Sequence, residues 1–199
     1  MKKRTTMIMI SLILSTVLIA GVTFAYFTAT SEEKVNTFTV GDNISIALAE
    51  PLFDGLDYDG EDVSEEDVAL GEDLALNILP GREIPKDPMV KNTSNDNVWV
   101  AIKLDYGKDI SSFAELDAFA SIIFDSNWEE KDGSNTVFYF KTEVGAGDET
   151  SSLFDNVTID NVSYEDLKEF DIEIMAYAVQ AEGVDFTDAK SELDDLMAP

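Results

Sequence analysis

The sequence has neither cysteine nor histidine, and these two absences exclude several kinds of chemistry. Without cysteine the chain has no disulfide and no thiol nucleophile. Without histidine it lacks the commonest zinc ligand and the commonest general base near neutral pH. A Ser–His–Asp or Cys–His hydrolase is therefore excluded, and no H-E-x-x-H zinc motif exists. We expect a protein that is not an enzyme.

Positive charge is also scarce. The chain has 13 Lys and Arg residues against 41 Asp and Glu residues, which gives a formal net charge of −28. Such a surface repels nucleic-acid phosphates and anionic lipids, because it has no cationic patch with which to release their counterions. We expect no nucleic-acid partner. Cations or a basic partner fit this charge better, and solubility is its simplest explanation.

The amino terminus has the pattern of a secretory signal. Residues 2–4 are basic, residues 7–20 are apolar, and Thr23 and Ala25 occupy the small-residue positions of a cleavage site. We predict a helical signal peptide over residues 1–25 and cleavage before Tyr26.

A retained membrane anchor is the competing interpretation, because the apolar stretch could extend to Phe27 and approach the length of a membrane span. After cleavage we expect a secreted protein in the extracellular matrix or on the cell surface. Only the uncleaved signal would then contact a membrane.

Residues 39–184 have the pattern of a β-domain. Val98, Val100, Ile102 and Leu104 alternate with other residues, and residues 170–180 are apolar on both faces of a predicted strand. Residues 128–131 and 136–142 predict a hairpin. Many short strands between turn residues favour a mostly β fold, a jelly-roll-like β-sandwich with short helices.

The remaining segments are assigned from composition and spacing. Residues 51–73 are dense in Asp and Glu and predict an acidic loop, and residues 74–79 predict a short strand. Helical spacing is expected within residues 111–119 and 164–168. Residues 185–199 predict an acidic helix or tail.

Two sequence blocks carry a family resemblance. AYFTATSEEKVNTFTVGDNISIAL follows the signal, and PGREIPKDPMVKNTSNDNVWVAIKL occupies residues 80–104. In this order, after such a signal, they resemble the TasA/camelysin family of exported proteins of Gram-positive bacteria. Members of that family are processed by a SipW-type signal peptidase.

The resemblance implies a secreted jelly-roll subunit of biofilm-matrix fibres, which assembles with itself and with related matrix proteins. It also implies donor-strand complementation, in which the new amino-terminal strand of one copy fills a groove in the next. Residues 26–38 would be that strand, anchored by Phe27, Val35 and Phe38. The alternative is that residues 26–38 form the first strand of their own domain.

A monomeric calcium-binding or cell-surface module is the second hypothesis. Asp57, Asp59 and Glu66 match positions 3, 5 and 12 of an EF-hand loop, but Gly55 stands where the first Asp belongs. A solvated acidic loop explains the same residues. Calcium is therefore a weak candidate, and no other cofactor is expected.

Two further chemistries are suggested by related proteins. The camelysin branch of the family implies a metalloprotease, which the lack of histidine makes the least favoured reading. An isopeptide crosslink would need a buried lysine beside an Asn or Asp and an assisting acid. Lys86, Lys91 and Lys103 lie on or beside predicted strands, and solvent-facing lysines are the simpler interpretation.

Overall fold

The computed structural model describes residues 44–64 and 69–198. All of these belong to the compact unit Lys34–Pro199. The predicted signal peptide, residues 1–25, and the predicted donor strand, residues 26–38, lie outside the described residues. Within them the chain is mostly β, with three antiparallel sheets and a few short helices.

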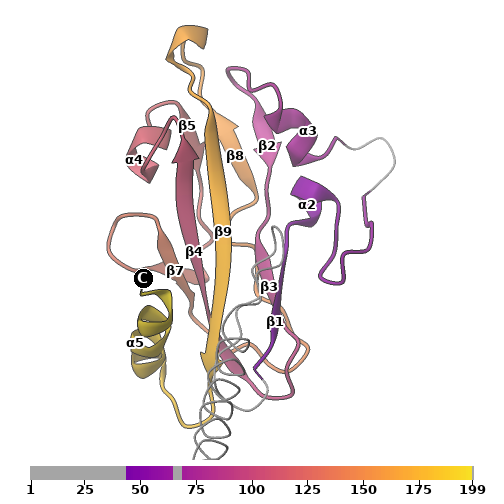
Figure 1. Cartoon of the computed structure of the whole chain (residues 1–199), viewed down its shortest axis with the longest axis vertical. Helices are drawn as coiled ribbons and strands as arrows, with labels where there is room; N and C mark the ends of the chain where they lie inside the picture. Colours follow the sequence, from indigo (N-terminus) through magenta and orange to yellow (C-terminus); the bar gives the residue numbers. More distant parts are fainter. Residues whose placement is uncertain (1–43, 65–68, 199) are drawn as a thin grey trace, which may run out of the picture. The chain divides into compact units, whose positions relative to one another are not determined.

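The largest sheet has four strands and is built around one long pair. β4 (Val98–Lys108) and β9 (Phe170–Gln180) run antiparallel over their full lengths of 11 residues, from Val98 opposite Gln180 to Lys108 opposite Phe170. The order in the sheet is β6-β7-β4-β9. β6 (Trp128–Glu130) and β7 (Val137–Phe140) form the predicted hairpin. Among the strands of residues 44–64 and 69–198, β4 is therefore internal and β9 lies at an edge (Figure 1).

Two smaller sheets share a core with this sheet. β1 (Ile46–Ala49) pairs with β3 (Met89–Asn92). β8 (Asn156–Ile159) pairs with both β2 (Glu83–Pro85) and β5 (Ala120–Ile122). Residues from all three sheets meet in one apolar cluster, which includes the predicted inward-facing set Val98, Val100, Ile102 and Leu104.

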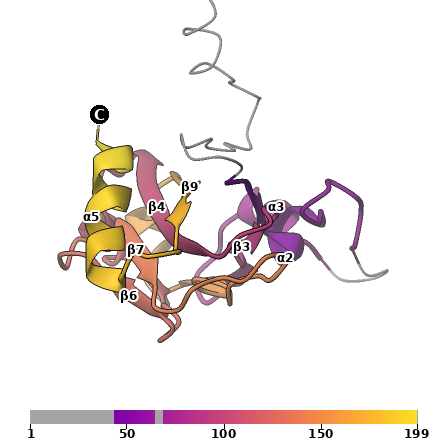
Figure 2. The ribbon, with the colours of Figure 1, turned by 90° about the horizontal axis from the view of Figure 1, so that it is seen from below.

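The opposite face of the large sheet carries a second cluster. Trp99 and Ala101 of β4 pack there with Leu193 of the carboxyl-terminal helix α5 (Phe186–Met197). The Asp185 carboxylate caps α5 by accepting hydrogen bonds from the next turn. Figure 2 shows α5 on the side of the sheet away from β1 and β3. Within the segment 185–199, for which an acidic helix or tail was expected, α5 takes up Phe186–Met197. Alternate residues of β4 pack in two different apolar clusters.

The remaining helices are short. They are α2 (Pro51–Asp54), α3 (Gly71–Ala75), α4 (Phe113–Leu116) and the 3₁₀ turn η1 (Tyr164–Asp166). The last two lie in segments predicted to be helical. No helix of residues 44–64 and 69–198 is long and apolar enough to cross a membrane.

Two predictions need correction. The segment 51–73 is not only a loop, because it contains α2 and the start of α3. The predicted strand over residues 74–79 is wrong. Leu74 and Ile78 pack against the core while Leu76 is 86% exposed, a spacing of four that suits a helical turn rather than a strand. The first residue of this turn, Gly71, is a glycine because a Cβ at this position would lie 1.9 Å from the backbone carbonyl oxygen of Pro85 in β2.

We predict that Leu104→Ala lowers the free energy of unfolding by about 2–5 kcal/mol, because it leaves a cavity in the shared core. Leu104 is 0% exposed, whereas Ile123 is 88% exposed. The matched control Ile123→Ala should change stability by no more than about 0.5 kcal/mol. Urea denaturation measures both variants, and equal losses would contradict this placement of the core.

Candidate functional site

Most residues singled out from the sequence lie outside the described part of the chain. These are Thr23, Ala25, Tyr26, Phe27, Val35, Phe38 and Glu66. Cleavage, strand donation and the twelfth position of the calcium loop therefore stay predictions. Asp57 and Asp59 are described, and so are Lys86, Lys91 and Lys103.

Asp57 closes a turn in the acidic segment. Its Oδ1 atom accepts hydrogen bonds from the backbone N–H groups of Asp59 and Glu61, each at 2.9 Å. This is an Asx turn, in which a side chain takes the place of a backbone acceptor. Within residues 44–64 and 69–198 no three acidic side chains are grouped closely enough to hold a metal ion. The calcium loop remains a proposal that depends on Glu66.

The three lysines proposed for crosslinking have different surroundings. The Lys103 ammonium lies 4.0 Å from Asp105 at the surface, and Lys91 lies over the Tyr58 ring. Lys86 is the buried one of the three, with 7% of the residue exposed. Its Nζ atom lies 2.8 Å from Oε1 of Glu50 and 4.0 Å from the centre of the Phe53 ring.

Asp87, the next residue, is buried as well. It is 4% exposed, and its Oδ1 atom accepts a 2.8 Å hydrogen bond from the N–H of Leu52 in α2. The pKa of the Asp87 carboxyl is raised to about 6, first by burial and then by the charges of Glu50 and Asp155. The Leu52 hydrogen bond acts in the opposite direction. We call Glu50, Lys86 and Asp87 the buried charged junction; Asp155, which is exposed, acts on it from the surface.

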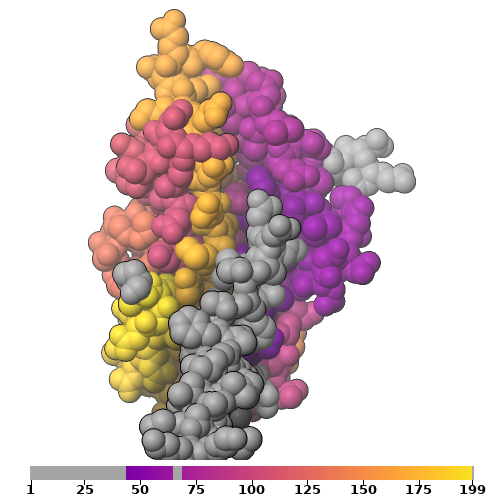
Figure 3. All heavy atoms as spheres, viewed as in Figure 1, coloured from indigo at the N-terminus to yellow at the C-terminus, as the bar shows by residue number. Residues whose placement is uncertain are grey.

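Sequence reasoning missed the junction. From the sequence, Lys86 was named only as a possible crosslinking lysine, and Asp87 was not singled out. Glu50 is 36 positions from Lys86 along the printed sequence, so no local pattern joins them. The junction ties α2 to the start of β3. In the space-filling view the segment from α2 to α3 forms one flank of the molecule (Figure 3).

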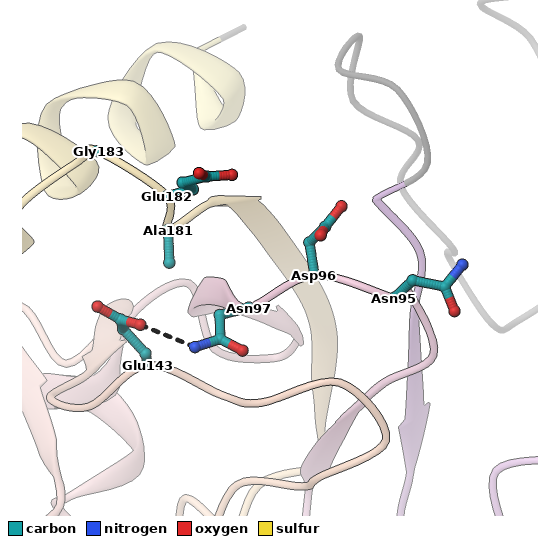
Figure 4. A pocket seen from close by; sticks show the side chains of 7 residues that line it. All are labelled: Asn95, Asp96, Asn97, Glu143, Ala181, Glu182 and Gly183. Carbon is teal, nitrogen blue, oxygen red and sulfur yellow. Dashed lines mark hydrogen bonds between the residues drawn. The ribbon is translucent and has the colours of Figure 1, made fainter.

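A shallow depression of about 410 Å³ lies where β4 begins and β9 ends. Its lining residues are Asn95, Asp96, Asn97, Glu143, Ala181, Glu182 and Gly183 (Figure 4). The Asn97 amide donates a 3.0 Å hydrogen bond to Glu143. The depression offers carboxylates and amides but no hydroxyl, thiol or amine side chain. Its chemistry is that of a solvated acidic surface.

The outer edge of β9 is the other candidate. The backbone N–H groups of Val98 and Leu104 bond away from β9, to Val144 and to Thr136. Leu104 lies opposite Ile174, so these two residues form a pair without hydrogen bonds between β4 and β9. Because such pairs alternate with hydrogen-bonded pairs along an antiparallel ladder, the backbone N–H and C=O groups of Ile174, and of Ile172 two residues earlier, point away from β4. Among the strands of residues 44–64 and 69–198, β4 alone pairs with β9.

Part of the edge of β9 is apolar and shielded from solvent. Ile172 and Ile174 are half-buried and pack against the shared core. β1 lies beside β9 without pairing with it (Figure 1). An edge that combines outward backbone groups with apolar side chains is a template for an added strand.

Comparison of the chain with family models, curated proteins and solved structures found no match.

We predict that Lys86→Met lowers the free energy of unfolding at neutral pH by about 3–5 kcal/mol, because it leaves the Glu50 carboxylate buried without its partner. Lys190→Met is the matched control, since Lys190 also contacts a carboxylate, Glu129, at 2.8 Å. That pair is more exposed, so its loss should cost about 0–1 kcal/mol. Equal costs in urea denaturation would mean that the junction is solvated.

Proposed function

We propose that this chain is a secreted structural subunit of extracellular matrix fibres. A SipW-type peptidase would remove residues 1–25, and the new amino-terminal segment of one copy would then pair with an open sheet edge of the next. The three antiparallel sheets would form a jelly-roll-like β-sandwich in this subunit. The function belongs to assembly rather than to catalysis.

The sequence supports this proposal in two ways. The signal pattern and the two blocks, residues 25–48 and 80–104, resemble the TasA/camelysin family in their order. The lack of histidine and cysteine removes the usual nucleophile and base pairs, so a structural role fits the composition better than a hydrolytic one.

The observation that carries the proposal is the outer edge of β9. The acceptor proposed here is the segment of β9 around Ile172 and Ile174, because an edge strand is a template for pairing with another chain. There Ile172 and Ile174 place apolar side chains beside outward backbone groups, between the exposed charges of Asp171 and Glu173. A strand added here would gain main-chain hydrogen bonds and apolar contacts at once.

The proposed donor has matching chemistry. Residues 26–38 contain Phe27, Val35 and Phe38, aromatic and β-branched residues that favour extended backbone. Residues 26–33 contain no Lys or Arg and two acids, Glu32 and Glu33. Its affinity for a strand edge would therefore come from backbone pairing and apolar contact rather than from attraction to an acidic surface.

We predict that mature protein beginning at Tyr26 forms fibres and that a version lacking residues 26–38 does not, as seen by negative-stain electron microscopy. The truncated protein keeps the acceptor edge, so a substoichiometric amount added to the intact protein should shorten the fibres. Circular dichroism must show that the truncated protein is folded. Equal fibre formation by both proteins would rule out strand donation.

Ile172→Pro tests the acceptor. Proline removes an N–H that points outward from β9 and leaves the hydrogen bonds to β4 intact, so we expect a folded protein that does not extend fibres. Glu173→Pro is the matched control, because the N–H of Glu173 points toward β4 and its loss should destabilise the domain. Normal fibres from folded Ile172→Pro would place the acceptor elsewhere.

A further inference from the structure

The buried charged junction holds more negative than positive charge. Glu50 and Asp87 supply two carboxyl groups and Lys86 supplies one ammonium, while the exposed Asp155 adds a third carboxyl group from the surface. The ammonium lies 2.8 Å from Glu50, so the main positive charge of the junction is engaged by that carboxylate. The Asp87 side chain instead accepts the Leu52 N–H.

This imbalance has a physical consequence. An ionised carboxylate that is 4% exposed and balanced only by amide N–H groups is costly, and such groups take up a proton at a higher pH than they do in water. The negative charges of Glu50 and Asp155 add to that cost. Protonation relieves it without removing the acceptor, because the carbonyl oxygen of a neutral carboxyl group still accepts the Leu52 N–H.

The junction also lies where the short helix α2 is attached to the sheets. α2 has 4 residues, too few for a stable helix by itself, and α3 has 5. Asp87 ties α2 to the connection between β2 and β3, and the Lys86 backbone N–H bonds to Asp155 beside β8. The strength of these contacts therefore decides how firmly the α2 segment is held.

We propose that Asp87 is a proton-binding site that tightens the docking of α2 onto the sheets as the surroundings acidify from neutral pH toward pH 5. The proposal does not depend on fibre formation. It concerns one subunit and would hold equally for a monomeric surface protein.

The direction of the effect follows from linkage. The pKa of Asp87 is raised from 3.8 to about 6, so the docked state binds the proton more tightly than the undocked state. Docking of α2 is therefore strongest below pH 3.8 and weakens as the pH rises through about 6. The charged groups that act on Asp87 are Glu50 and Asp155, and its charge in turn acts on the Tyr58 phenol.

Amide hydrogen exchange at Leu52 in the full chain, followed by NMR, tests the proposal. After correction for intrinsic exchange, protection of this N–H should rise about tenfold between pH 7 and pH 5, as the linkage relation gives for a shift of this size. The carboxyl carbon of Asp87 should titrate with a midpoint near 6. A midpoint near the ordinary value of 3.8 would overturn the proposal.

Asp87→Asn is the decisive variant. The amide keeps an oxygen acceptor for the Leu52 N–H but cannot titrate, so Leu52 protection should become independent of pH over this range. Asp185→Asn is the matched control, because Asp185 is an exposed carboxylate that caps α5 in the same way. It should leave the tenfold response unchanged. A tenfold response that persists in Asp87→Asn would also overturn the proposal.

Glu50→Gln gives an independent check. It removes a negative charge beside Asp87 and frees the Lys86 ammonium, and both changes favour ionised Asp87. The Asp87 midpoint should therefore move to lower pH. An unchanged midpoint would mean that Asp87 does not sense the junction, which contradicts the proposal.

Discussion

The antiparallel pairing of β4 with β9 is the constraint on which the rest of the structure depends. It fixes two faces at once, because alternate residues of β4 enter the shared core and the cluster beneath α5. A shift of one residue would exchange those two sets, placing Trp99 where Val98 now packs. Lys108 and Phe170, which lie opposite each other, are 62 positions apart in the sequence, so the pairing closes a long loop.

An acidic chain can form this fold because its charges are segregated from both clusters. The apolar residues of β4 and β9 face inward, while Asp105, Asp171 and Glu173 remain exposed on the part of the large sheet that α5 does not cover. The buried charged junction breaks this rule. Lys86 and Asp87 are both buried, and the Glu50 carboxylate compensates the charge of Lys86 while it adds to the negative charge around Asp87.

The sequence predicted the elements whose pattern is local. β4, β9 and the β6–β7 hairpin were identified because two-residue alternation and a turn signal are written in consecutive residues. The turn at Leu74 was predicted as a strand because Leu74, Leu76 and Ile78 are apolar and two residues apart, as on one face of a strand. Leu76 is exposed, and the sequence alone does not show this. The junction could not be foreseen, since the burial of Lys86 and Asp87 depends on Glu50 and Asp155 from distant segments. The site residues predicted near the amino terminus lie outside the described residues.

The two proposed sites lie on different elements but are connected through β1. The strand ends at Ala49, directly before Glu50, and it lies beside β9 without pairing with it. The ion pair between Glu50 and Lys86 therefore holds the end of β1 against the connection from β2 to β3. A change in the charge of Asp87 acts on the same residues, because Leu52 follows Glu50 by two positions. The Glu50–Lys86 ion pair and the Asp87–Leu52 hydrogen bond thus both act next to the end of β1, the strand that lies beside β9 in the described part of the chain.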